Sequence, residues 1–286
     1  MNEISKDELM RGLLTEADLQ EKNENKTALN GLITVYKKWG KTPLETLDEL
    51  RQKYPLLEGV PLSYAGRLDP LAEGLMLILV GEINKDREKY LGLDKTYEVE
   101  ILFGIKTDTG DLFGLPYFNV GAQEKLGAGE VSKVLKSFVG KQQFPYPVYS
   151  SKTVQGKPLF QWMNEGRIGE IEIPKTDVEI YSLELLEADL NPVKKVSGAE
   201  ILEKVELALK SVKGDFRYDE MRAGWASILD GREEDNFSVI KINCECSSGT
   251  YMRVLAEEIG KKMGVPALAY SIRRTEVGGV ELRDIK

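Results

Sequence analysis

The residue best placed to do chemistry is Asp69, which lies between Leu68 and Pro70 with glycines at positions 66 and 74 on either side. Gly66 permits backbone conformations closed to other residues, and Pro70 fixes its own φ and favours an extended conformation at the residue before it. The carboxylate is therefore expected on a stiff loop, where it could act as a nucleophile or a base. The alternative is an Asp that only caps a turn.

The side chains available for chemistry are restricted, because the sequence contains no histidine and only two cysteines. The lack of histidine excludes Ser-His and Cys-His nucleophile systems and most transition-metal sites. Cys244 and Cys246 are two residues apart, a spacing that suits neither a usual disulfide nor a zinc pair of the C-x-x-C kind. We expect two reduced core cysteines, no metal, and chemistry that uses carboxylates, tyrosines, lysines and arginines.

Length and composition predict a globular protein, since 286 residues with 42% apolar side chains can bury a substantial core. No apolar run approaches the roughly 18 residues that a membrane-spanning helix needs. The segment from Asn2 to Glu24 is polar and acidic, and it lacks the apolar part of a signal peptide. We therefore expect a cytoplasmic protein with no membrane partner.

The formal net charge of −8 argues, taken alone, against a nucleic-acid partner. The charge is unevenly distributed, however, because residues 177–240 carry 8 basic and 15 acidic side chains, whereas residues 131–175 carry 7 basic and 3 acidic ones. A run of charge is usually a solvated face. Here the basic segment is also compatible with a local surface that faces phosphates.

The elements that must position Asp69 follow from the hydrophobic pattern. The apolar run 75–80 has the length and composition of a strand buried on both faces, which would anchor the loop to the core. Alternation predicts further strands over residues 31–36, 95–104, 171–190 and 238–246. Capping residues and periodicity predict helices over residues 44–54, 130–140, 198–212 and 218–229, and a last helix closed by Gly260. The expected fold class is α+β (mixed α/β), with a central, mainly antiparallel sheet flanked by helices.

A segment between Gln142 and Arg167 interleaves aromatic residues with lysine and proline, and it includes Tyr149 and Lys152. Such a rigid, positively charged surface that can stack on bases is typical of proteins that bind loop RNA. The alternative is a proline-rich surface connection.

Several blocks of the sequence resemble the TruB-type pseudouridine synthases, which act on the T-loop uridine at tRNA position 55. The most specific blocks are the stretch from Gly66 to Gly74, with its Asp-Pro-Leu-Ala-x-Gly tail, and residues 247–260, Ser-Ser-Gly-Thr-Tyr-x-Arg followed by a helix. Weaker matches are the turn after residue 36, the Lys-x-Tyr block at residues 95–111, the segment 142–176 and the end of the chain at 267–279. In all, the resemblance covers about residues 31–176 and 238–279.

The resemblance implies a pseudouridine synthase fold and an RNA-modifying isomerase with no cofactor, because the reaction involves no net redox change. It implies that Asp69 is the catalytic carboxylate and that Arg253 pairs with it. It also implies that Tyr97 stacks on the target base and is a candidate base for the proton transfer. The implied partner is the T arm of tRNA, and the residues expected to bind it are Tyr64, Gly66, Arg67, Tyr251, Ile272, Lys37, Tyr149 and Lys152.

The implied domain organisation is a polar N-terminal arm or helix at residues 1–30 followed by one catalytic domain at 31–286. The catalytic domain would contain a thumb-like RNA-binding segment at 142–176 and an acidic helical insertion at 190–237. Because acidic helices repel phosphate, we expect the insertion away from the RNA, as a lid, a dimer contact or a separate small subdomain. We also expect that the C-terminal RNA-binding domain usual in the family is missing.

The sequence departs from the family near Asp69. Tyr64 stands where the family commonly carries a histidine, and Arg67 is more like the other pseudouridine synthase branches. Two alternatives therefore remain: a pseudouridine synthase that acts on another tRNA position or on rRNA, or a non-catalytic RNA-binding protein that keeps the fold. A glycoside hydrolase would need a second acid, for which Glu73 is the nearest candidate. The oligomeric state is left open.

Overall fold

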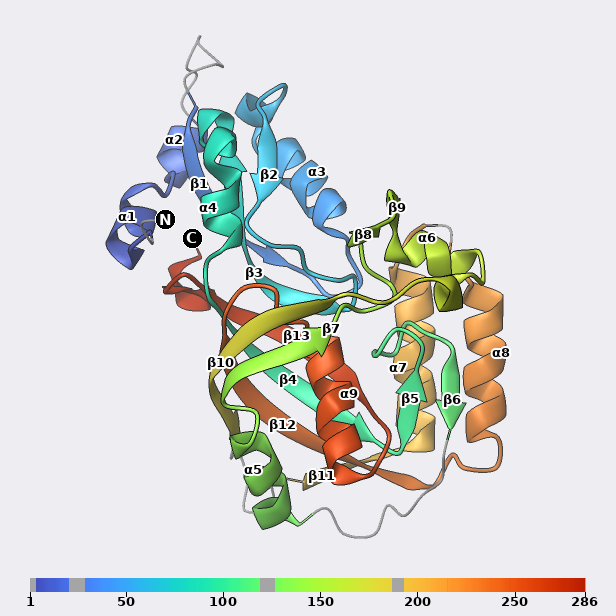
Figure 1. Cartoon of the computed structure of the whole chain (residues 1–286). Helices are drawn as coiled ribbons and strands as arrows, with labels where there is room; N and C mark the ends of the chain where they lie inside the picture. The colour runs from blue at the N-terminus through green and yellow to red at the C-terminus, as the bar shows by residue number, and fades with distance from the viewer. Residues whose placement is uncertain (1–3, 21–28, 119–126, 187–192, 215, 286) are drawn as a thin grey trace. The chain divides into compact units, whose positions relative to one another are not determined.

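The computed structural model describes residues 4–20, 29–118, 127–186, 193–214 and 216–285 (Figure 1). Ten of its described strands form one sheet whose main path is β1-β3-β13-β4-β12-β10-β7, with β2, β11 and β14 paired to β3, β12 and β13. The other described strands form two separate pairs, β5 with β6 and β8 with β9. The registers of β1 with β3, of β12 with β10 and β11, and of β10 with β7 are all antiparallel. The predicted fold class of helices around a mainly antiparallel sheet is confirmed.

The chain divides into two compact units, residues 1–97 with 273–286 and residues 98–272. The boundary falls inside two strands, β4 (Lys95–Phe103) and β13 (Ala267–Val277), so each unit contains part of both. The other elements of the first unit are α1 (Lys6–Arg11), α2 (Glu16–Gln20), β1 (Gly31–Lys37), α3 (Pro43–Lys53), η2 (Pro55–Leu57), β2 (Leu62–Tyr64), β3 (Ala72–Val80), η3 (Gly81–Asp86), α4 (Arg87–Leu91), β14 (Val280–Glu281) and η5 (Leu282–Asp284).

Strand β3 is the centre of the first unit. Its residues from Leu75 to Val80 are fully buried, as expected for an apolar strand covered on both faces. The N-terminal arm joins the same core, since Leu9 of α1 packs in a buried cluster with Leu32 and Val277. The arm also contacts β1 through its backbone, where the Leu14 amide donates to the Leu32 carbonyl at 2.8 Å. The described part of residues 1–30 therefore consists of two short helices packed on this core.

The second unit is built on β12 (Asn236–Cys246), which pairs with β10 (Lys175–Leu185) and β11 (Val193–Ser197). Helix α9 (Met252–Met263) covers one face of these strands (Figure 1). Cys244 and Cys246 are buried and free, as expected. The remaining elements are β5 (Ile105–Thr107), β6 (Pro116–Phe118), α5 (Ala128–Lys136), β7 (Gly140–Pro145), β8 (Thr153–Val154), β9 (Lys157–Pro158), α6 (Leu159–Asn164), η4 (Ile168–Glu170), α7 (Gly198–Ser211) and α8 (Tyr218–Leu229).

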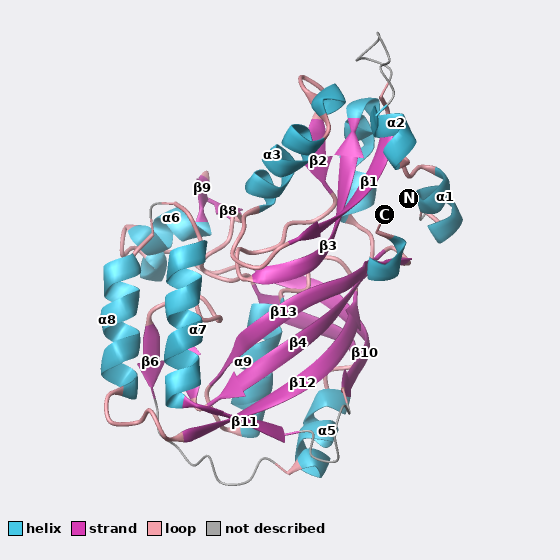
Figure 2. Ribbon diagram, turned by 180° about the vertical axis from the view of Figure 1, so that it is seen from behind, coloured by secondary structure: helices cyan, strands magenta, loops and turns pink. Residues whose placement is uncertain are grey.

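The acidic insertion forms the two helices that the sequence predicts, with bounds that agree within a residue. Figure 2 shows α7 and α8 lying side by side as an antiparallel pair. They belong to the second unit rather than to a subdomain of their own, and the buried Trp225 of α8 donates from Nε1 to the carbonyl of Gly114 at 3.1 Å. Residues 190–192 and 215 of the expected insertion lie outside the described residues.

The prediction that Gly260 closes the last helix is wrong. Helix α9 continues to Met263 and is capped by Gly264, which has the left-handed φ of 72°. Gly260 lies inside the helix because the chain returns closely past it: a Cβ there would be 2.6 Å from the Val265 carbonyl oxygen and 2.5 Å from the Ala267 Cβ. The glycine is required by close packing, and the cap lies four residues later.

Among the residues that the structure describes, no helix has both the length and the apolar character needed to cross a bilayer. Within the same residues, no group of three or more cysteine, aspartate or glutamate side chains is arranged to hold a metal ion.

Replacing Gly74 by alanine should lower the free energy of unfolding of the protein more than replacing Gly59 by alanine does. Both glycines have positive φ, 111° and 74°, but a Cβ at position 74 would be 2.2 Å from the Arg274 carbonyl oxygen, whereas nothing lies within 4 Å at position 59. We expect Gly59→Ala to lose about 1–2 kcal/mol of unfolding free energy from backbone strain. Gly74→Ala should lose about 1–3 kcal/mol more from overpacking. Urea denaturation measures the difference, and equal losses would contradict this packing.

Candidate active site

The loop that carries Asp69 connects β2 to β3 and is fixed by its apolar neighbours. Ala65, Leu68 and Leu71 are buried, whereas Asp69 between them is half-buried. The Ala65 amide donates to the Leu77 carbonyl at 2.8 Å, and the Ala72 amide donates to the Asp69 carbonyl at 3.0 Å. The loop is therefore anchored to the central strand on both sides of the carboxylate, as the sequence predicts.

Lys37 lies beneath this loop with its whole side chain buried. Its Nζ donates to the carbonyl oxygens of Lys38 at 3.2 Å, Pro70 at 3.1 Å and Ala72 at 2.5 Å. The amide of Gly40 donates to the same Pro70 carbonyl at 2.9 Å. The turn after β1 thus packs against the Asp69 loop, which favours the functional interpretation of that turn over a simple connection to α3.

The pKa of the Lys37 amine depends on the carboxylates of this loop and of the strand after it. Burial lowers the pKa of the amine to about 8, while the carboxylate of Asp69, and after it that of Glu73, act in the opposite direction and favour the charged form. A lysine with three carbonyl acceptors and a neighbouring carboxylate has the partners that a buried cation requires.

Two further cations of this unit, Arg274 and Lys95, are buried, and neither burial was predicted from the sequence. Arg274 contacts the loop, whereas Lys95 contacts the segment before β4. Arg274 donates from Nε to the Leu75 carbonyl at 2.8 Å and from Nη2 to the Gly66 carbonyl at 3.3 Å. Lys95 donates from Nζ to the carbonyls of Leu91, at 2.8 Å, and Leu93. The available signal was strand alternation: Lys95 shares a face with the buried Tyr97, and Arg274 shares one with Ile272.

The structure places most of the predicted residues of the reaction in the first unit. Tyr97 is buried in β4, Tyr64 is half-buried in β2, and Arg67 is exposed beside Asp69. Gly66 has a φ of 93°, which explains why a glycine is needed where the loop turns.

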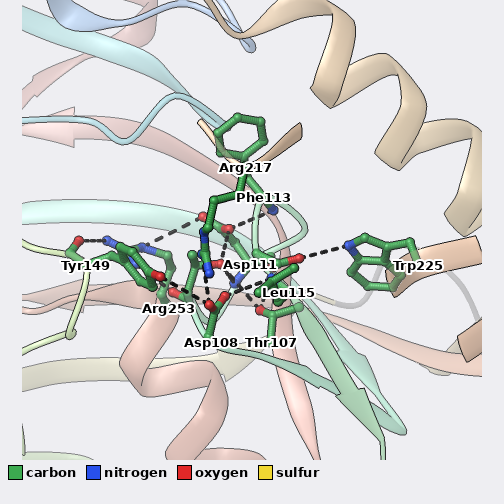
Figure 3. Close-up of polar contacts among 11 residues, drawn as sticks. Thr107, Asp108, Asp111, Phe113, Leu115, Tyr149, Arg217, Trp225 and Arg253 are labelled. Carbon is green, nitrogen blue, oxygen red and sulfur yellow. Dashed lines mark hydrogen bonds and ion pairs between the residues drawn. The ribbon is translucent and has the colours of Figure 1, made fainter. Parts of the chain in front are cut away.

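Arg253 lies in the second unit, near the start of α9, and its guanidinium is buried. It donates from Nη1 to the Thr109 carbonyl at 2.6 Å and from Nη2 to the Tyr149 carbonyl at 3.4 Å, and its Nε lies 3.9 Å from Oδ2 of Asp111 (Figure 3). Because Asp69 belongs to the first unit, its pairing with Arg253 stays a prediction.

Asp108 and Asp111 hold the turn between β5 and β6. Oδ1 of Asp111 accepts from the Phe113 amide at 2.9 Å, and Oδ1 of Asp108 accepts from the Leu115 amide at 2.8 Å. The other oxygen of Asp108 accepts from the Tyr149 hydroxyl at 3.3 Å. Burial, followed by the Asp108 carboxylate, raises the pKa of Tyr149 to about 12, so this hydroxyl stays a donor at neutral pH.

The predicted thumb segment brings lysine and aromatic side chains together in the second unit. Lys152 Nζ lies 4.8 Å from the centre of the Tyr146 ring, which packs edge-on against Tyr251 with a centroid distance of 5.9 Å. Lys157 lies in the same way 4.5 Å above the ring of Trp162. Ile272, also expected in the substrate pocket, is buried in β13.

The sequence matches the family model "TruB family pseudouridylate synthase (N terminal domain)" over residues 61–216. The chain belongs to this family. It is 30% identical to the tRNA pseudouridine synthase B of Caldicellulosiruptor saccharolyticus over 257 residues, 89% of this chain and 70% of the relative. It is also 30% identical to the protein of that name from Psychrobacter cryohalolentis, over 94% of this chain and 62% of the relative. Membership of the TruB family makes the chain a pseudouridylate synthase and excludes the glycoside hydrolase alternative.

Two solved structures share the fold. A chain in the structure of an H/ACA RNP bound to a substrate RNA containing 2'-deoxyuridine aligns with a TM-score of 0.50 at 14% identity, over 89% of this chain and 49% of that chain. A chain of a Cbf5-Nop10-Gar1 complex aligns with the same score and identity, over 86% of this chain and 48% of that chain. This TruB-family chain therefore spans about half the length of either.

Lys37→Met should impair both stability and turnover, because three carbonyls around Asp69 lose their buried donor. We expect a loss of about 2–4 kcal/mol in the free energy of unfolding and a lower rate of pseudouridine formation per folded molecule. Lys38→Met is the matched control, since Lys38 is exposed on the same turn. Urea denaturation and a turnover assay at one pH measure the two effects. Equal behaviour of the two variants would contradict the structural role of Lys37.

The stability difference between wild type and Lys37→Met should grow with pH. The folded pKa of Lys37, about 8, lies below the ordinary value of 10.5. Between these two values the unfolded chain binds more protons than the folded one, so this group makes the protein more stable as pH rises. The variant lacks the group and should not show that gain. Unfolding free energies measured from pH 7.5 to pH 10 test this, and a difference that stays flat or shrinks would contradict it.

Proposed function

We propose that this chain is a cytoplasmic enzyme that converts uridine to pseudouridine in the T loop of tRNA, at position 55, with Asp69 as the catalytic carboxylate. One observation supports the choice of Asp69 above others: in a TruB-family chain, Lys37 and Arg274 hold the carbonyls on both sides of this residue. A half-buried carboxylate fixed in this way is preorganised for catalysis. The curated relatives named tRNA pseudouridine synthase B support the choice of RNA.

In the proposed reaction the C–N glycosidic bond of the target uridine breaks, the base rotates, and a C–C bond forms at C5. The Asp69 carboxylate acts as nucleophile or as the base that starts the cleavage. As the resemblance to the family implies, Arg253 pairs with this carboxylate and orients it. Tyr97 stacks on the base, and its hydroxyl takes the proton that leaves C5. The C5 proton passes through Tyr97 to solvent, and N1, freed from the sugar, gains a proton, so the product is an isomer of uridine and no cofactor is needed.

Docking of the T arm is assigned to two basic surfaces. The target uridine must leave its loop, and the thumb segment offers the Lys152, Tyr146 and Tyr251 cluster for stacking and phosphate contacts. Tyr149 lies at the base of the same segment. In the first unit, Tyr64 and the exposed Arg67 precede Asp69 on the same loop and the strand before it, and we assign them to contact or displace the target base. Ile272 and Gly66 would complete the pocket.

A second candidate is the same reaction on another uridine, in tRNA or in rRNA. The observation that favours it is local: Tyr64 and Arg67 replace the residues usual for the TruB type directly beside the catalytic carboxylate. Differences at this position change what displaces the target base, whereas Asp69 itself is unchanged.

Tritium release from tRNA transcripts made with C5-labelled uridine tests the proposal. We expect the wild-type chain to release tritium from a full tRNA, and to lose that release when position 55 alone is changed to cytidine. Release that survives this change would contradict the assignment of position 55 and would favour the second candidate. No release from either tRNA or rRNA fragments would indicate a non-catalytic RNA-binding protein.

A further inference from the structure

One contact between the helical insertion and the segments around Arg253 is made by the side chain of Arg217. This residue directly precedes α8, and its Nη2 lies 2.8 Å from Oδ2 of Asp108. Its guanidinium carbon also lies 4.9 Å from the centre of the Tyr149 ring. Figure 3 shows Arg217 above Asp108, with Arg253 and Tyr149 on one side and Trp225 on the other. The insertion was expected to lie away from the RNA, and no contact of its residues with the segments around Arg253 was predicted.

Both partners of Arg217 belong to the segments that hold Arg253. Asp108 directly precedes Thr109, whose carbonyl accepts from Nη1 of Arg253 at 2.6 Å, and Tyr149 provides the second carbonyl acceptor at 3.4 Å. The Tyr149 hydroxyl and Arg217 converge on the same carboxylate oxygen of Asp108. Arg217 therefore joins the two chain segments that supply the acceptors of Arg253.

The helical pair keeps Arg217 in place. Trp225 of α8 is buried and donates to the Gly114 carbonyl, and the rings of Phe216 and Phe113 meet edge to face with a centroid distance of 5.1 Å. The side chain of Asp108 is 13% exposed and that of Arg217 is 30% exposed. Because this ion pair is more shielded from solvent than a typical surface pair, it should contribute more to stability than a surface pair does.

We propose that Arg217 is a positioning residue for Arg253, and that the insertion serves to fix the turn at 107–115 and Tyr149 in the geometry that orients this arginine. The inference rests on the proposed function only in so far as Arg253 acts on the catalytic carboxylate. The contacts that carry it lie within the second unit. A displacement of about 1 Å in a positioning group can cost about 100-fold in rate.

Arg217→Gln tests the proposal against the matched control Arg222→Gln. Arg222 lies within α8 and pairs with Glu206 at 2.9 Å, and 46% of its side chain is exposed. We expect Arg217→Gln to lower kcat for the tRNA transcript by about 10- to 100-fold with little change in KM. Arg217→Lys, which keeps the charge but not the planar stack on Tyr149, should recover part of the loss. Arg222→Gln should match wild type.

Other outcomes would overturn the inference. A raised KM with unchanged kcat and a weaker salt dependence would make Arg217 an RNA contact. A lower melting temperature with unchanged kcat would make it only a stabilising residue. If Arg217 and Asp108 act as a pair, Asp108→Asn in the Arg217→Gln background should add little further loss in kcat, so additive losses would contradict the pairing.

A second readout does not require turnover and separates this inference from the proposed function. Amide hydrogen exchange in the turn at 107–115 and around Tyr149 should be faster in Arg217→Gln than in wild type or Arg222→Gln. Exchange that is unchanged would overturn the positioning role even in an active enzyme. A wild-type chain that releases no tritium would refute the proposed function, and the exchange data would still decide whether Arg217 fixes these segments.

Discussion

Burial of positive charge is the constraint on which the Asp69 loop depends. A buried cation without acceptors costs several kcal/mol, and Lys37, Lys95 and Arg274 are all buried in the first unit. Lys37 and Arg274 take acceptors from the carbonyls on either side of Asp69, and Lys95 takes them from the segment that enters β4. Moving the loop would remove buried acceptors from Lys37 and Arg274. The backbone on either side of Asp69 is therefore held in place by hydrogen bonds from buried cations.

The second unit follows the same rule. Arg253 is buried, and the carbonyls of Thr109 and Tyr149 are its acceptors. These carbonyls come from segments that are held in turn by Asp108, and Asp108 is held by Arg217 of the insertion. The chain of contacts links an acidic helical pair to a buried arginine. The residue of the insertion that makes the contact is a cation, Arg217.

Local patterns were sufficient to predict much of the fold. The apolar run of β3 predicted a strand buried on both faces, and periodicity with capping predicted α7 and α8 within a residue. Short motifs predicted the TruB family, which the family match confirms. Gly260 was mistaken for a helix cap because a glycine that caps and a glycine that permits close approach look the same in sequence.

The parts that sequence reasoning missed depend on contacts between distant residues. A lysine or arginine in a strand is usually solvent-facing, whereas Lys95 and Arg274 are buried beside carbonyl acceptors that the fold brings to them. The contact between Arg217 and Asp108 joins residues more than a hundred positions apart, and the acidic composition around Arg217 gave no sign of it. The net charge of the insertion is an average over many residues, and it does not predict the contact that a single arginine, Arg217, makes with Asp108.

The central claim is that the carboxylate of Asp69 carries the reaction, and comparing Asp69→Asn with wild type tests it most directly. The variant keeps the size of the side chain, so tRNA binding measured by filter retention should stay within about threefold (roughly 0.7 kcal/mol). Single-turnover tritium release should fall by about 10⁴-fold or more, as when an essential catalytic group is removed. Tritium release that stays within about tenfold of wild type, with binding intact, would contradict the account.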